Sequence, residues 1–279
     1  MRINRIILIV NSIVAFFEKI KIFKDTIKHI KNWYTPINFY LGISNKEDTI
    51  YFKNGIKCII RNKIDSIAFF ENYFLKVNNP NKKFKIKNDD IVIDVGAHIG
   101  YFTMYAANNA NQGTVYSIEP YKESFEILKK NLKLNNITNV KPFNAAISKV
   151  TKEITLYIDK NNEIGNSIFR TNNTTESKKI NSFNLDDFVK NNEIEKIDFL
   201  KLDCEGAEFE IILNFNKELM KKIKKISAEI HENNNTHSLD ELVIFLRKNN
   251  FEVNTSNMSN DITMKLSMLY AENKECIEN

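Results

Sequence analysis

The chain has 279 residues, of which 43% are hydrophobic and 27% charged, a balance that is ordinary for a soluble globular protein. Its formal net charge of +5 comes from both signs mixed along the chain, so a nucleic-acid partner is less favoured than a small-molecule or sugar substrate. The three cysteines, Cys58, Cys204 and Cys276, are odd in number and far apart, which predicts neither a disulfide framework nor a CxxC metal pair and favours the reducing cytoplasm.

Residues 3 to 31 have the apolar spacing of one amphipathic helix. Its most apolar part, Ile6 to Phe17, is shorter than the roughly 20 residues that span a bilayer, and no small-residue cleavage site of a signal peptide follows it. We favour a helix that packs on its own domain. The alternative is a helix that lies on a membrane surface, because basic residues flank the apolar face: Arg2, Arg5, Lys19, Lys21 and Lys24.

Residues 49 to 61 predict a β-hairpin, because Asn54-Gly55 stands between two β-rich runs. We therefore expect residues 1–88 to form an N-terminal extension of an amphipathic helix and a hairpin. Residues 89–279 form the second predicted domain.

From Asp90 onward, short buried strands alternate with helices. The predicted strands are Ile91 to Val95, Val115 to Ile118, Val140 to Phe143, Phe199 to Leu202 and Ile226 to Ile230, and the clearest helices are Lys122 to Leu134 and Ala207 to Phe215. This alternation predicts an α/β, Rossmann-like, doubly wound sheet that is mostly parallel with an antiparallel edge strand.

Two further regions flank or interrupt that pattern. Residues 148 to 179 break it, and we expect a hairpin-like insertion on the substrate side. The tail is predicted to contain a helix around Leu239 to Lys248 and two extended runs, Phe251 to Asn254 and Ile262 to Leu269.

The run from Ile91 to Gly100 predicts a nucleotide-like ligand at the end of the first of these strands. Asp94 is followed by a turn with Gly96 and Gly100, where backbone can approach a ligand, and then by the free N–H groups of a helix. Glu119 ends the next strand, 19 positions after Gly100, where a carboxylate can accept the two hydroxyls of an unphosphorylated ribose.

The competing interpretation is the dehydrogenase fingerprint GxGxxG, but His98 stands where its second glycine is required, which disfavours NAD(P). A purely structural role remains open for each feature alone, with Gly96 and Gly100 as turn residues and Glu119 as a solvated strand end. Their combination in one strand and turn context favours the ligand site.

From about Asp90 to Glu232, about half of the chain, the sequence resembles the FkbM family of S-adenosylmethionine (AdoMet)-dependent methyltransferases. The residues that carry the resemblance are Asp94 to Thr103, Glu119-Pro120, Asn144 to Ala146, Leu185-Asp186 and Ile197 to Glu208. His98 is a mild departure, since the family commonly has Asn there. Members mostly O-methylate sugars and other hydroxylated natural products, so the resemblance implies that class of acceptor.

The resemblance also implies AdoMet as the cofactor and assigns its binding residues by position. Asp94, Gly96, Ala97 and Gly100 would shape the pocket for the methionine part of AdoMet. Glu119 would hold the ribose, and Asn144 and Ala145 would border the adenine.

For catalysis, an alcohol acceptor needs help to lose its proton, from a general base or a metal. We predict Asp203, Glu205 and His231 as the catalytic residues, because they end or follow two predicted strands and His has a suitable unperturbed pKa. Structural alternatives are that Asp203 caps the following helix and that Glu208 is a buried partner of Lys201. We expect Glu205 and Glu208 to share a helix face. No metal site is predicted, since two carboxylates two positions apart are weak support for one.

The sequence thus favours an AdoMet-dependent O-methyltransferase with a small-molecule or glycan hydroxyl as acceptor, in the cytoplasm or at its membrane face. Peripheral membrane contact through residues 1–31 is the alternative to a helix packed on its own domain. An N-methyltransferase on the same fold, a non-catalytic ligand-binding or scaffold module, and a membrane adaptor are the alternatives. The acceptor and the oligomeric state are not determined by the sequence.

Overall fold

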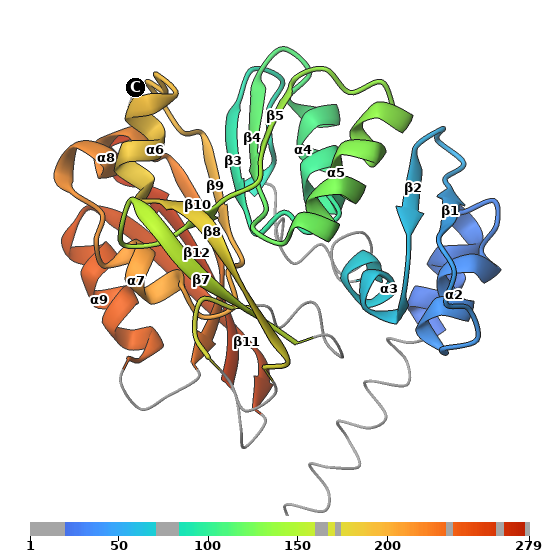
Figure 1. Cartoon of the computed structure of the whole chain (residues 1–279). Coiled ribbons are helices and arrows are strands. Elements are labelled where there is room, and N and C mark those ends of the chain that lie inside the picture. The colour runs from blue at the N-terminus through green and yellow to red at the C-terminus, as the bar shows by residue number, and fades with distance from the viewer. Residues whose placement is uncertain are drawn as a thin grey trace, which may run out of the picture. The chain divides into compact units, whose positions relative to one another are not determined.

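The computed structural model describes residues 20–70, 84–159, 167–170, 174–232, 237–260 and 265–276. The chain forms two compact units, residues 1–76 and residues 77–279, which we describe separately (Figure 1). The predicted domain division after residue 88 stays a prediction.

The first unit contains the predicted hairpin. Its strands β1 (Asp48–Tyr51) and β2 (Lys57–Ile60) pair antiparallel around Asn54-Gly55, and Gly55 has a φ of +96°, which glycine adopts at little cost. Helix α2 (Tyr34–Tyr40) precedes the hairpin and α3 (Lys63–Phe70) follows it. The hairpin prediction is confirmed.

The predicted N-terminal amphipathic helix lies only partly within the described residues. Residues 20–29 are helical, and Ile30 then makes a β-bridge with Phe52. Residues 1–19, which include most of the apolar face, lie outside the described part. Within the described part, each helix is too short or too polar to cross a membrane.

The second unit is built on a seven-stranded sheet with the order β11-β12-β10-β9-β3-β4-β5. The strands are β3 (Ile91–Val95), β4 (Thr114–Ile118), β5 (Val140–Phe143), β9 (Phe199–Leu202), β10 (Lys225–Glu232), β11 (Phe251–Asn260) and β12 (Lys265–Asn273). Strands β10, β9, β3, β4 and β5 are parallel, whereas β12 is antiparallel to both of its neighbours. The mostly parallel α/β fold is confirmed, although β12 lies one position inside the edge, which β11 occupies.

Helices cover both faces of this sheet, as a doubly wound fold requires (Figure 1). One face carries α4 (Tyr101–Asn109) and α5 (Lys122–Leu134). The other carries α6 (Leu185–Asn191), α7 (Glu208–Ile212), α8 (Lys217–Lys222) and α9 (Leu239–Lys248), and the 3₁₀ turn Lys274–Cys276 follows β12.

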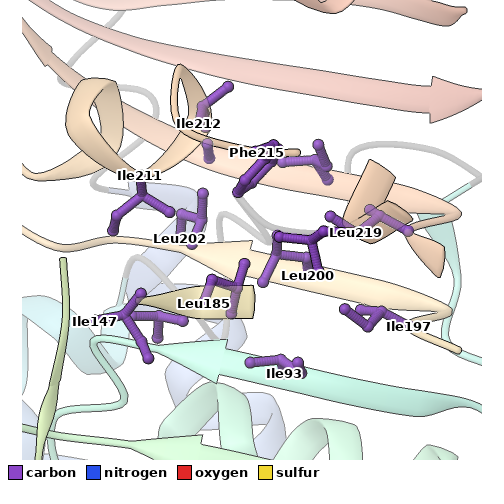
Figure 2. Close-up of a cluster of buried hydrophobic side chains, with 14 of the residues drawn as sticks. Ile93, Ile147, Leu185, Ile197, Leu200, Leu202, Ile211, Ile212, Phe215 and Leu219 are labelled. Atoms are coloured by element: carbon purple, nitrogen blue, oxygen red, sulfur yellow. The ribbon is translucent and has the colours of Figure 1, made fainter. Parts of the chain in front are cut away.

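A hydrophobic core lies on each face of the sheet, and successive residues of a strand point alternately into one core and the other. On β3, Ile93 packs among the helices α6 to α9, whereas Val92 packs against α4. Figure 2 shows the first of these cores, in which Leu200 and Leu202 of β9 meet Leu185 of α6 and side chains of α7 and α8. Both faces of β3 and β9 are buried, which explains why apolar residues fill consecutive positions of both strands apart from the buried Asp94 and Lys201.

A second, three-stranded sheet with the order β6-β8-β7 contains the predicted insertion. Strand β7 (Lys152–Ile158) pairs antiparallel with β8 (Glu176–Phe183), and β6 (Ala146–Ile147) pairs parallel with β8. The hairpin character of the insertion is therefore confirmed. Its residues 160–166 and 171–173 lie outside the described part.

Candidate active site

The glycine turn between β3 and α4 folds back on the end of β4. The backbone N–H groups of Gly96 and Ala97 both donate to the carbonyl of Ile118, over 3.0 and 3.1 Å. Gly96 and Gly100 have φ values of +76° and +92°, so both positions require the left-handed region that favours glycine. The turn thus brings the N-terminus of α4 to the carboxyl end of the parallel strands.

The structure gives a packing reason for both glycines, in addition to the ligand approach that we expected. A Cβ on Gly96 would lie 1.7 Å from the backbone oxygen of Asp203, and one on Gly100 would lie 2.4 Å from a methyl group of Leu128. The turn is therefore held tightly between the end of β9 and helix α5.

Lys201 of the neighbouring strand β9 holds the glycine turn in place. Its Nζ donates to the carbonyl of Gly96 over 2.8 Å and lies 3.3 Å from a carboxylate oxygen of both Asp94 and Asp203. Burial alone would lower the pKa of Lys201, but the neighbouring Asp203 and Asp94 more than offset it and raise the pKa. Asp94 is fully buried and also accepts a hydrogen bond from Thr103, so it supports the turn from inside the protein.

Glu119 stands at the end of β4 with its carboxylate held by two backbone groups. The N–H of His98 donates to Oε2 over 2.7 Å, and the N–H of Tyr121 donates to Oε1 over 2.8 Å. Burial raises the pKa of Glu119 to about 7, although the N–H groups of Tyr121 and His98 act in the opposite sense. Each oxygen keeps a second lone pair, so the carboxylate can still accept two hydroxyl donors.

Asn144 and Ala145 follow β5, the next strand of the sheet. The side chain of Asn144 is exposed and donates to the carbonyls of Glu119 and Pro120, which ties the ends of β4 and β5 together. Ala145 is buried in the core. Their expected position beside an adenine stays a prediction.

Asp203, Glu205 and His231 come together at the ends of β9 and β10. One potential ligand atom from each lies within 4.8 Å of the others. The Nε2 atom of His231 lies 3.5 Å from Oε2 of Glu205 and 3.8 Å from Oε1 of Glu229. The side chain of His231 is only 4% exposed, whereas those of Asp203 and Glu205 are 26% and 18% exposed. The three predicted catalytic residues therefore form one cluster.

Glu208 holds this cluster in place, and its partner differs from the expected one. It is fully buried at the start of α7, where it contacts Nδ1 of His231 over 3.2 Å and accepts the N–H groups of Cys204 and Gly206. Glu208 is a buried structural residue, as the alternative had it, but its partner is His231, because Asp94 and Asp203 bind Lys201.

One expectation and one structural alternative near this cluster also fail. Glu205 lies in the turn before α7 with a φ of +53°, so it does not share a helix face with Glu208. Asp203 does not cap α7, whose N-cap is Ala207 without a side-chain bond. The helix needs no such cap, because Glu208 already binds the preceding turn.

The insertion reaches the same turn. Ser167, in the segment between β7 and β8, donates its hydroxyl to the carbonyl of Glu205 over 2.7 Å. The insertion therefore contacts the turn that holds Glu205. Its expected place beside the substrate stays a prediction.

The family of the chain follows from comparison with known proteins. The family described as the methyltransferase FkbM domain matches residues 94–253, which are more than half of the chain and include the glycine turn, Glu119 and the Asp203 cluster. The chain belongs to this family. Membership confirms the resemblance found in the sequence, and AdoMet is the cofactor that matches this family.

Curated relatives of this FkbM domain are distant. "Methyltransferase 1" of Beauveria bassiana is 24% identical over 51% of this chain and 65% of its own length, and "Methyltransferase sdnD" of Sordaria araneosa is 22% identical over 53% and 68%. The "AMB antimetabolite synthetase AmbE" of Pseudomonas aeruginosa is 24% identical over 59% of this chain, which is 10% of that protein. The chain thus spans less than two thirds of the length of Methyltransferase 1 and one tenth of the length of the AmbE synthetase.

Solved structures with a similar arrangement include a methyltransferase FkbM from Methylobacillus flagellatus KT, with 14% identity and a TM-score of 0.48 over 92% of this chain and 60% of that one. Another is M. capricolum TrmK in complex with S-adenosylhomocysteine, with 19% identity and a TM-score of 0.42 over 68% and 65%. The fold assignment rests on the strand order of the chain itself.

The residues present fit AdoMet on two counts. Glu119 offers a buried, oriented carboxylate for the ribose. Farther along the strand ends, carboxylates outnumber the cationic groups Lys201 and His231, and this excess of negative charge suits a positively charged sulfonium.

Proposed function

We propose that this FkbM domain is an AdoMet-dependent O-methyltransferase whose acceptor is a hydroxyl of a sugar, glycolipid or related metabolite. The observation that supports it is the cluster of Asp203, Glu205 and His231 in the same row of strand ends as Glu119. Proton-accepting groups are thereby available beside the crevice in which ligands bind to such sheets.

AdoMet supplies a methyl group that is already activated as part of a sulfonium. The C–S bond breaks with its electron pair left on sulfur, a C–O bond forms to the acceptor, and the hydroxyl proton must leave. Positioning of the acceptor supplies most of the rate, and removal of the proton requires a base at the oxygen. A neutral amine acceptor could attack before it loses a proton, so a carboxylate-rich site favours oxygen as the acceptor atom.

The carboxylates of Asp203 and Glu205 are the groups that can take this proton. His231 was also predicted as a base, but its surroundings oppose that role in the protein without ligands. Burial lowers the pKa of His231, but the carboxylates of Glu208 and Glu205 raise it by more than burial lowers it. The resulting pKa lies well above 6.5. An imidazolium at neutral pH has no lone pair with which to accept a proton.

The acceptor is proposed to be a small molecule or glycan rather than a nucleic acid, because the charged residues of both signs are mixed along the sequence. We place the protein in the cytoplasm, with peripheral membrane contact through residues 1–31 where the acceptor is a lipid-linked sugar. Such an acceptor would connect the enzyme to polysaccharide biosynthesis.

The test is product analysis with AdoMet labelled in its methyl group. The purified chain is incubated with pools of nucleotide sugars, lipid-linked oligosaccharides, amines and RNA, and labelled products are identified by mass spectrometry. We expect a methyl ether on a sugar together with S-adenosylhomocysteine. Label found only on nitrogen or only in RNA would contradict the proposal, and binding of S-adenosylhomocysteine without turnover on any pool would favour a non-catalytic module.

Variants connect the reaction to the cluster. Asp203→Asn and Glu205→Gln should each lower kcat by about 100-fold, the scale of general-base catalysis, while binding of S-adenosylhomocysteine is kept. Glu210→Gln is the matched control, since this carboxylate also lies on the α7 segment but pairs with Lys149 away from the cluster.

A further inference from the structure

The cluster at the ends of β9 and β10 has the composition of a metal site. Asp203 and Glu205 each offer a carboxylate oxygen and His231 offers an imidazole nitrogen, and the three atoms lie within 4.8 Å of one another. Ligands about 2.1 Å from a common divalent ion are separated by about 3 Å or more, so small side-chain rotations would bring these atoms to coordination distance.

The orientation of His231 is an independent observation. Its Nδ1 atom faces Oε1 of Glu208 over 3.2 Å, and Glu208 is fixed by the backbone N–H groups of Cys204 and Gly206 over 2.8 and 3.0 Å. Because a carboxylate accepts and does not donate, Nδ1 carries the proton in this contact. A buried carboxylate that orients a histidine in this way is the usual outer partner of a metal-bound imidazole.

Glu208 thereby directs the other nitrogen of His231 into the cluster. Nε2 faces Oε2 of Glu205 at 3.5 Å and Oε1 of Glu229 at 3.8 Å. The side chain of His231 is only 4% exposed. In the protein without ligands Nε2 also carries a proton, and a cation that displaced this proton would leave the Nε2 lone pair facing an ion held among carboxylate oxygens. Such a set of acceptors is stable when a cation lies between them.

We propose that Asp203, Glu205 and His231 together bind one divalent cation at the acceptor end of the crevice. Carboxylate ligands suit Mn²⁺ and an imidazole suits other transition-metal ions, so a set of two carboxylates and one imidazole fits Mn²⁺ or a similar divalent ion. Three protein ligands leave coordination positions for other groups, which is the arrangement of catalytic rather than structural metal sites.

The role of the ion rests on the proposed function. A sugar hydroxyl bound in an open position would lose its proton more readily, because the cation stabilises the alkoxide. A neighbouring hydroxyl in a second position would fix which oxygen faces the methyl group. In this arrangement the three side chains act as ligands, and the proton passes to solvent or to a carboxylate oxygen that the ion does not hold.

The test measures metal binding directly, without methyl transfer. The full chain is treated with a chelator, titrated with Mn²⁺ by calorimetry, and followed by the electron paramagnetic resonance signal of free Mn²⁺. We expect one ion per chain, and we expect Asp203→Asn and Glu205→Gln each to weaken Mn²⁺ binding by at least about tenfold. Glu210→Gln, at a carboxylate that pairs with Lys149, should bind Mn²⁺ like the unchanged chain.

Glu208→Gln probes the orientation of His231. It should weaken Mn²⁺ binding by about 10-fold to 100-fold. Because Glu208 also binds the turn before α7, circular dichroism and thermal unfolding are measured on the same samples. The Asp203→Asn and Glu205→Gln variants keep the test decisive should Glu208→Gln fail to fold.

Two outcomes would overturn the metal site: no Mn²⁺ binding by folded chain, or binding that both Asp203→Asn and Glu205→Gln leave intact. Titration with S-adenosylhomocysteine on the same preparation separates this failure from failure of the proposed function. Protein that binds S-adenosylhomocysteine but not Mn²⁺ would refute the cation alone. Protein that binds Mn²⁺ but not S-adenosylhomocysteine would keep the cation and refute the methyltransferase proposal.

Discussion

Glu119→Gln tests the predicted ribose contact because it keeps the size of the side chain and removes its charge. The carboxylate accepts the backbone N–H of His98 at one oxygen and that of Tyr121 at the other. A Gln side chain has one oxygen and one NH₂ group, so it can keep one of these two bonds. Its NH₂ group also cannot accept a ribose hydroxyl.

The expected loss of cofactor affinity follows from those contacts. A hydrogen bond to a charged partner contributes about 1.5–3 kcal/mol. Losing one hydroxyl contact and weakening the other corresponds to about 2–4 kcal/mol, so the dissociation constant of S-adenosylhomocysteine should rise by about 30-fold to 1,000-fold.

The pH dependence gives a second signature. Burial raises the pKa of Glu119 to about 7, and the ionised form is the one that accepts both hydroxyls. Affinity for S-adenosylhomocysteine should therefore be constant well above pH 7 and fall by up to about tenfold for each pH unit below it. Glu119→Gln should remove this dependence, since its side chain does not titrate.

Stability changes in the opposite sense. The folded pKa of Glu119 lies above the ordinary value of 4.5, so the stabilising contribution of this group is present below pH 4.5 and is lost as the pH rises through about 7. The loss corresponds to about 3 kcal/mol. The stability deficit of Glu119→Gln relative to the unchanged chain should consequently shrink between pH 5 and pH 8 in urea unfolding.

The assay is isothermal titration with S-adenosylhomocysteine at several pH values, with NAD as a parallel ligand that should not bind. Glu126→Gln serves as the control, because that carboxylate is exposed on α5 and pairs with Lys129. The reasoning would be refuted by folded Glu119→Gln protein that binds S-adenosylhomocysteine within about threefold of the unchanged chain, since the expected loss is at least about 30-fold.

Three further predictions concern stability and membrane contact. Gly96→Ala should destabilise the fold by about 3 kcal/mol or more in urea unfolding, because its Cβ would overlap a backbone oxygen. Gly55→Ala is the control: its Cβ would meet nothing within 4 Å, so it should cost about 1 kcal/mol from backbone strain. Similar losses for the two variants would argue against tight packing at Gly96. Lys201→Met should lower the free energy of unfolding by about 3–5 kcal/mol, because it leaves the buried carboxylate of Asp94 without its cation. A smaller loss in urea unfolding would show that the ion pair is dispensable. Phe23→Ser with Ile27→Ser, two exposed apolar side chains of the helix over residues 20–29, should lower co-sedimentation with anionic vesicles, and unchanged co-sedimentation would count against membrane contact through this helix.

The sequence by itself determined the features that depend on neighbouring residues. The apolar runs at β3 and β9 predicted buried parallel strands, and Asn54-Gly55 predicted the hairpin, because pleating and turn geometry act over a few residues. The glycine turn and Glu119 were also predictable, since each directly follows a strand whose end lies at one edge of the sheet.

Partner choice inside the site depended on the tertiary structure. Lys201 binds the carbonyl of Gly96, 105 positions earlier, because β9 lies beside β3 in the sheet, and local periodicity carries no information on strand order. For the same reason the structural alternative for Glu208 named Lys201 as its partner, whereas β10, on the other side of β9, places His231 against Glu208.

The pKa values of these groups also could not be predicted from the sequence pattern. An isolated His or Glu has its ordinary pKa, whereas burial and the surrounding charges shift the pKa values of His231 and Glu119 in the folded chain. The sequence therefore determined which residues stand at the strand ends, and the order of the strands decided which charges meet there and what chemistry they can support.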